Sequence, residues 1–108
     1  MLNQVIVVGR LVEKPVLEEN GNGRKYSVVT LAVPRSFRND EGVYDTDFIK
    51  FILWSSVAEN TAEYCEKGDL LGIKGRLQCL GGSELQVVAE KVTYLASNKN
   101  NYNNREVY

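Results

Sequence analysis

The chain has 108 residues, with 13 lysines and arginines against 14 aspartates and glutamates, no histidine and a formal charge of −1. This length predicts one domain that buries a core without disulfides, and no apolar run approaches the roughly 18 to 20 residues of a membrane span. With no histidine, and with Cys65 and Cys79 alone, the sequence offers no metal site. We expect a cytoplasmic protein with reduced cysteines and no cofactor.

Three strands are predicted in the first half of the chain. Residues 4–12 are β-branched and apolar, and Gly9 predicts a bend or bulge within them. Residues 24–35 and 46–54 alternate apolar side chains with other residues, as half-buried strands do. The predicted core joins these positions with those of a later strand: Val29, Leu31, Ile49, Phe51, Leu53, Leu71, Ile73 and Leu77.

One helix and two further strands follow. Ser56 and Glu59 have the spacing of a capping box, and residues 57–67 contain no proline or glycine. Strands are predicted over 70–77 and 84–95, joined by a tight Gly81-Gly82 turn. This order predicts an all-β, five-stranded Greek-key barrel of the OB type, with one short helix between strands 3 and 4. An open sheet with one packed helix is the alternative.

The composition changes once, near the end of the chain. Residues 97–108 read SNKNNYNNREVY and are polar and rich in asparagine. Such a segment buries too little apolar surface to offset the entropy lost on ordering. We therefore expect an OB-fold domain over 1–96 and a polar disordered tail over 97–108.

The even positions of the third strand indicate a function. Phe48, Lys50, Ile52 and Trp54 combine aromatic, basic and aliphatic side chains on one face, along about 20 Å of strand. Unpaired bases stack on aromatic rings while lysine meets phosphate, so this pattern favours single-stranded nucleic acid. The alternative interpretation is a second buried face, covered by a loop or by another subunit.

A second signal lies in the segment VPRSFRN at 33–39. Phe37 stands between Arg35 and Arg38 where a strand enters a polar loop, so its ring is expected to lie near the surface. An exposed phenylalanine flanked by two guanidinium groups suits a finger that stacks a base and meets phosphates. In the alternative, Phe37 packs on the end of the barrel and the arginines pair with Asp40 or Glu41.

These segments and their order resemble a known family. The matching stretches are LNQVIVVGRLVEKP (2–15), VTLAVPRSF (29–37), TDFIKFILWSSVAENTAEYCEKGDLLGIKGRLQ (46–78) and VVAEKVTYL (87–95). The chain is similar over nearly all of residues 1–96 to the bacterial single-stranded DNA-binding protein family. The resemblance implies an OB fold, assembly as a homotetramer, and binding of single-stranded DNA during replication, recombination or repair. It also implies base stacking at Phe37, Phe48 and Trp54.

The chain departs from the family in four places. Glu18 and Glu19 replace a basic and aromatic pair, and Ser56 stands where lysine is common. The hairpin at 78–84 is short and lacks a stacking aromatic, and the tail lacks the acidic tip that ends in phenylalanine. We expect a short form of the family with a smaller DNA footprint, and the tail argues against recruitment of replication and repair proteins.

The remaining cations and acids complete the predicted site. Phosphate contacts are expected at Lys50 and at five arginines and lysines elsewhere: Arg35, Arg38, Arg10, Lys25 and Arg76. No pair of carboxylates stands beside a general acid and no phosphate-binding glycine loop is present, so no catalytic residue is assigned and an enzyme is not expected. Two other functions stay open: a primosomal accessory protein acting through protein partners, and a structural oligomerisation barrel.

Overall fold

The computed structural model describes residues 1–98, so most of the predicted tail lies outside the described residues. In this part of the chain the elements follow in order: β1 (Val5–Leu11), β2 (Glu18–Glu19), β3 (Lys25–Arg38), β4 (Tyr44–Trp54), α1 (Ser55–Tyr64), β5 (Leu70–Leu80) and β6 (Glu84–Ala96).

Five of these strands close into a barrel. The sheet runs β1-β5-β6-β4-β3, and β1 also pairs with β3, which joins the two ends of the ring. The pair β4–β6 is parallel and the other pairs of the ring are antiparallel. With α1 between the third and fourth barrel strands, this is the predicted OB-type barrel, and the open-sheet alternative is wrong. The two-residue β2 lies outside the ring, paired only with β3.

Two glycines allow the strands to approach closely enough for closure. A Cβ atom at Gly9 would lie 2.7 Å from the carbonyl oxygen of Ala32 on β3. At Gly75 a Cβ would collide with the carbonyl oxygen of Val88 on β6. Any side chain here would push neighbouring strands apart, so both glycines are requirements of the backbone.

The core lies inside the barrel and under α1. Seven of the eight predicted core residues belong to it, with Ile49 only partly buried. Leu77 is the exception and that prediction is wrong, because its side chain is 41% exposed where β5 has already left the barrel. The buried apolar cluster is Leu11, Val29, Leu31, Phe51, Leu53, Ala58, Cys65, Leu71, Ile73 and Ala89.

The helix begins and ends earlier than predicted, because α1 covers Ser55–Tyr64 and the sequence indicated residues 57–67. It starts at Ser55, directly after β4, and no side chain caps its first turn, so the Ser56–Glu59 capping box is wrong. At the other end Lys14 donates hydrogen bonds from Nζ to the carbonyl oxygens of Ala62 and Cys65. A cation is favourable at the carbonyl end of a helix. Here the cation does not belong to the helix itself, because Lys14 lies in a loop far away in the sequence. No helix among residues 1–98 has the length and apolar character needed to cross a membrane.

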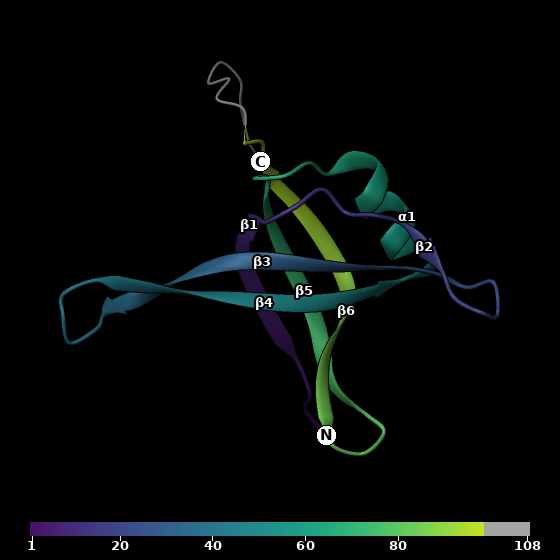
Figure 1. The fold of residues 1–108 in the computed structure, drawn as a ribbon, viewed down its shortest axis with the longest axis horizontal. Helices are drawn as coiled ribbons and strands as arrows, with labels where there is room; N and C mark the ends of the chain where they lie inside the picture. Colours follow the sequence, from purple (N-terminus) through teal and green to yellow (C-terminus); the bar gives the residue numbers. More distant parts are fainter. Residues whose placement is uncertain (99–108) are drawn as a thin grey trace.

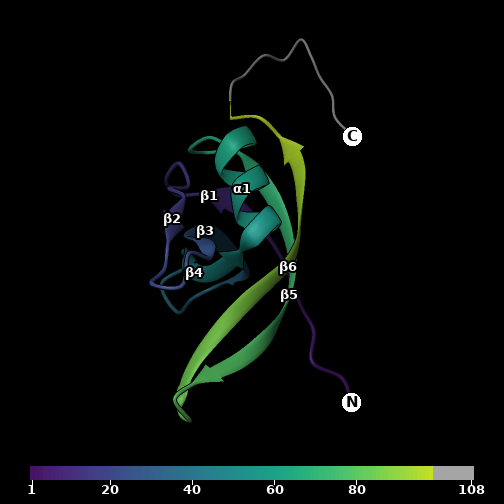
Figure 2. The ribbon, with the colours of Figure 1, turned by 90° about the vertical axis from the view of Figure 1, so that its right-hand side faces the viewer.

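The β3–β4 and β5–β6 hairpins both extend beyond the barrel (Figure 1). One is the far part of β3 and β4, residues 33–47, which we call the arm. The other is the end of β5 and β6, residues 77–87, which we call the β5–β6 tip. Figure 2 shows the β5–β6 tip reaching away from the barrel, while α1 covers the opposite end.

Candidate nucleic-acid interface

The outer face of β4 carries the predicted stacking residues, and we call its positions Phe48, Lys50, Ile52 and Trp54 the platform. Alternation along β4 turns Phe51 and Leu53 into the core and the platform to the other side. Phe48 is 65% exposed, Lys50 is exposed and Trp54 is half-buried. Within residues 1–98, no loop covers Phe48, so the buried-face alternative does not hold for it in the single chain.

Ile52 behaves differently from the rest of the platform. Its side chain is only 6% exposed, because β6 runs parallel to β4 at this point and places Val88 opposite it. The platform is therefore interrupted in the middle by a buried residue. The two exposed aromatic positions lie on either side of it.

A groove of about 510 Å³ lies between the platform and the β5–β6 tip. The sequence indicated a short hairpin here, and the turn is indeed short. One of its strands is longer than predicted, however, since β5 continues past residue 77 to Leu80, while β6 begins at Glu84 as predicted. The platform forms one wall of the groove. The aliphatic side chains of the β5–β6 tip form the other wall. The groove is lined by Val28, Phe48, Lys50, Ile52, Leu80, Leu85 and Val87, among others.

Trp54 belongs to a small cluster that the sequence pattern did not indicate. Its ring centroid lies 5.5 Å from that of Tyr26, its direct partner on β3. The guanidinium carbon of Arg24 lies 4.2 Å from the centre of the indole, and Arg24 Nε also donates to Ser55 Oγ at 3.4 Å. A base that stacks on this side of Trp54 must displace Arg24. Both residues lie within the strand predicted over 24–35, but no local pattern places them beside Trp54. Tyr26 meets it through the β3–β4 register, and Arg24 lies just before β3.

The arm carries the second group of predicted residues. Phe37 is 62% exposed, so it does not pack on the end of the barrel. Arg38 pairs in register with Tyr44, and its guanidinium carbon lies 5.2 Å from the centre of the tyrosine ring. Tyr44 shares the face of Phe48, four residues further along the same strand. The strand was predicted over 46–54, and extending it by two residues toward the N-terminus would have included Tyr44 on the face of Phe48.

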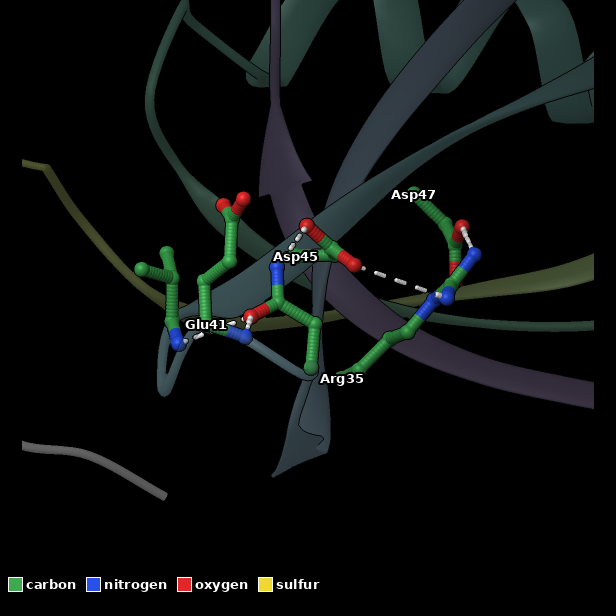
Figure 3. Close-up of polar contacts among 6 residues, drawn as sticks. Arg35, Glu41, Asp45 and Asp47 are labelled. Carbon is green, nitrogen blue, oxygen red and sulfur yellow. Dashed lines mark hydrogen bonds and ion pairs between the residues drawn. The ribbon is translucent and has the colours of Figure 1, made fainter.

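Arg35 lies on the other face of the arm. Its guanidinium forms two hydrogen bonds with Asp47, from Nε at 3.1 Å and from Nη2 at 2.9 Å. A second carboxylate, Asp45, lies 3.8 Å away (Figure 3). The hydrogen bond from Arg35 lowers the pKa of Asp47, and the same bond raises the pKa of the guanidinium. The alternative interpretation, in which the arginines pair with Asp40 or Glu41, is thus wrong for Arg35, whose partners are Asp47 and Asp45.

The other predicted phosphate contacts are spread over the barrel. Arg10 donates to the carbonyl oxygen of Gly68 at 3.1 Å, and Arg76 forms an ion pair with Glu90 at 3.2 Å. Lys25 is exposed and stands opposite Glu19 of β2 in the register. Lys50 forms no ion pair or side-chain hydrogen bond within residues 1–98, and it lines the groove. These side chains do not form one cluster, and their roles as phosphate contacts stay predictions.

The cysteines show no sign of a reactive centre. Both are free, Cys65 buried and Cys79 exposed. Burial raises the pKa of the Cys65 thiol, which keeps it protonated and a poor nucleophile. In the described part of the chain no three ligating side chains gather as a metal site would need.

A closed barrel with an exposed aromatic and basic sheet face beside a groove is the arrangement of OB-fold domains that bind single strands. The model of the single-strand binding protein family matches residues 2–99, and the chain belongs to this family.

The relatives agree with this assignment. Single-stranded DNA-binding protein B of Bacillus subtilis (strain 168) is 49% identical over 78 residues, covering 72% of this chain and 69% of that protein. Single-stranded DNA-binding protein 2 of Listeria innocua serovar 6a is 35% identical over an alignment that covers 100% of this chain and 77% of that protein. With the single-stranded DNA-binding protein of Bacillus cereus, 47% identical, the match covers 46% of the relative.

Two solved structures share the fold. The SSB domain of a Synechococcus protein superposes with a TM-score of 0.69 over 87% of this chain and 97% of that one, at 18% identity. A deletion mutant of the single-stranded DNA binding protein from Thermus aquaticus also gives 0.69, over 87% of this chain and 50% of that one, at 27% identity. The predicted barrel is confirmed.

Proposed function

We propose that this protein binds single-stranded DNA with little sequence preference and protects it during replication, recombination or repair. The observation that carries this proposal is the exposed platform beside the open groove. Phe48 presents an exposed ring where a strand of DNA would lie against β4, and Lys50 presents an ammonium group that forms no ion pair within residues 1–98. The family and the names of the relatives support the same function.

Stacking supplies most of the binding free energy in this proposal. Each base on an aromatic ring contributes about 1 to 3 kcal/mol, whatever its identity. Phe48 and Trp54 would stack bases on either side of Ile52, and Phe37 would stack another on the arm. The aliphatic wall of the β5–β6 tip would cover bases in the groove from the other side.

Phosphate contacts form the second part of the binding surface. Lys50 lies within the groove and Arg38 on the same side of the arm as Phe48, so these two would meet the backbone directly. Arg10, Lys25 and Arg76 are assigned weaker, peripheral contacts, since two of them already bond to protein groups. Each phosphate neutralised on a single strand contributes about 0.7 to the slope of log affinity against log salt.

Assembly and cellular setting complete the proposal. We place the protein in the cytoplasm with the nucleoid, as a homo-oligomer, with a homotetramer as the expected form. It acts as a binding protein without a catalytic step or a cofactor. The recruitment of other proteins through the tail concerns residues outside the described ones and is not proposed.

The test replaces Phe48 by alanine and measures affinity for a fluorescent oligo-dT by anisotropy. We expect a loss of roughly 5- to 150-fold, the equivalent of about 1 to 3 kcal/mol for one lost stacking contact. Tyr64→Ala is the matched control, because Tyr64 is an equally exposed aromatic on α1. Its affinity should not change.

Other outcomes would identify the rival functions. Light scattering shows whether each variant keeps its oligomeric state, and circular dichroism shows whether it keeps its fold. If Phe48→Ala dissociates or unfolds the protein, the platform is an oligomerisation surface. If the unaltered protein does not bind oligo-dT at all, an accessory role through protein partners replaces the proposal.

A further inference from the structure

The two faces of the arm carry different charges. Residues 33–47 contain two arginines and four acids, so the arm has a formal charge of −2 although its VPRSFRN segment alone is basic. Alternation along β4 places Asp45 and Asp47 on one face and Tyr44 and Phe48 on the other. Arg35 lies with the acids on the face that continues the core side of the sheet. The guanidinium group is therefore directed away from the platform.

Arg35 also stands where the two strands of the arm lose their backbone pairing. The register places Pro34 opposite Thr46 and then resumes at Arg38 opposite Tyr44, so β3 has extra residues at 35–37. Proline removes one more backbone donor at the start of this gap. The two-bond contact from Arg35 to Asp47 is the side-chain link between the strands at this point.

The link continues to the end of the arm. Asp45 lies beside Arg35 and also accepts a hydrogen bond from Asn39 Nδ2 at 3.2 Å. Asn39 Oδ1 in turn accepts the backbone N–H groups of Glu41, at 2.8 Å, and Val43, at 3.0 Å. Figure 3 shows this chain of contacts running from Asp47 through Arg35 to the loop. It fixes the loop that sets the position of Phe37, Arg38 and Tyr44.

We propose that Arg35 is a positioning residue that orders the arm through Asp47 and Asp45 and makes no contact with DNA phosphate. This inference rests on the proposed function and changes one assignment within it. Phosphate contacts on the arm then belong to Arg38, whose guanidinium lies over Tyr44 on the platform side. Arg35 affects the affinity for DNA only through the conformation of the arm.

The first test uses salt dependence to distinguish a direct phosphate contact by Arg35 from an effect of Arg35 on the conformation of the arm. Affinity for a long oligo-dT is measured at several salt concentrations for Arg35→Gln and, as matched controls, for Lys50→Gln and Arg38→Gln. The controls should each lower the salt slope by about 0.7, the value for one phosphate contact on a single strand. Arg35→Gln should weaken binding equally at all salt concentrations and leave the slope unchanged. A slope lowered as in the controls would overturn the proposal.

The second test exchanges the partners. Arg35→Asp combined with Asp47→Arg restores an ion pair across the arm but moves the cation to the other strand. We expect the double variant to recover the affinity that Arg35→Asp alone loses. If Arg35 contacts phosphate from its own position, the double variant stays as weak as the single one.

A third measurement needs no DNA. Amide hydrogen exchange at Glu41 and Val43 reports the order of the loop, and it should be faster in Arg35→Gln and in Asp47→Asn than in the unaltered protein. Unchanged exchange would overturn the proposal. If the unaltered protein did not bind oligo-dT, the proposed function would fail, and this exchange would still decide whether Arg35 orders the arm.

Discussion

The β3–β4 hairpin has two halves built from the same two strands but held together in different ways. Inside the barrel, the inner face of the hairpin buries Val29, Phe51 and Leu53 to 3% exposure or less. In the arm, the same face carries Arg35, Asp45 and Asp47, which remain about half exposed. The alternation of side chains continues through both halves, but only one of them meets a core. Where no other strands cover the inner face, ion pairs and hydrogen bonds replace apolar packing.

The largest expected effect is a difference in unfolding free energy between substitutions in the barrel half of the hairpin and substitutions in the arm. Phe51→Ala leaves a cavity in the barrel and should lower the free energy of unfolding by about 3 to 5 kcal/mol. Asp47→Ala removes the exposed ion pair of the arm and should leave the urea midpoint unchanged, since exposed pairs contribute little to stability. Urea unfolding followed by circular dichroism at one fixed protein concentration measures both. Similar losses for the two variants would show that the arm is part of the cooperative core.

A smaller effect is expected in DNA affinity, where the two halves of the hairpin should differ in how the loss depends on the length of the strand. Phe48→Ala should weaken binding of oligo-dT of both about 4 and about 16 nucleotides, which span the usual site sizes of one OB fold. Tyr44→Ala should have no effect on the shorter strand and cost about 1 kcal/mol on the longer one, because only the longer strand reaches the arm. Equal losses on the short strand would place Tyr44 within the main site.

The smallest expected effect is the pH dependence of the arm. The hydrogen bond from Arg35 lowers the pKa of Asp47 below its ordinary value of 3.8. A carboxylate with a lowered pKa in the folded protein contributes its full stabilisation above the unfolded pKa and loses it as the pH falls through the folded one. The NMR signal of Arg35 Nε–H should therefore stay constant above about pH 5 and shift only as the pH falls below 3.8. A shift centred above this value would mean that Asp47 and Arg35 are not paired in solution.

Several features of the fold could be predicted from local sequence. The strands of the first half, the helix and the order of elements follow from periodicity and from the glycines. The alternation of 46–54 placed Phe51 and Leu53 in the core and Phe48 and Lys50 outside it. The order of elements predicted the barrel, and the residue patterns predicted the stacking positions. The family resemblance agreed with both and added the assignment to single-stranded DNA, and the comparisons confirm the family and the fold.

Other features depended on contacts between distant residues. Leu77 is exposed because β5 leaves the barrel before it, and Ile52 is buried because β6 runs beside it. Tyr26 lies against Trp54 through the β3–β4 pairing, and Arg24 lies over the same ring from the position just before β3. Lys14 bonds to the end of α1, at Ala62, 48 residues away. None of these contacts repeats with a period along the chain, so no local pattern indicates them.

The sequence by itself determined which side chains share a face, because successive residues of a strand point to opposite sides wherever the strand lies. It determined the family as well, through residues at matching spacing. Only the tertiary structure decided what each face meets: a core, a groove or water. That outcome depends on strand register and on where the barrel ends, and both are set by packing between segments far apart in the chain.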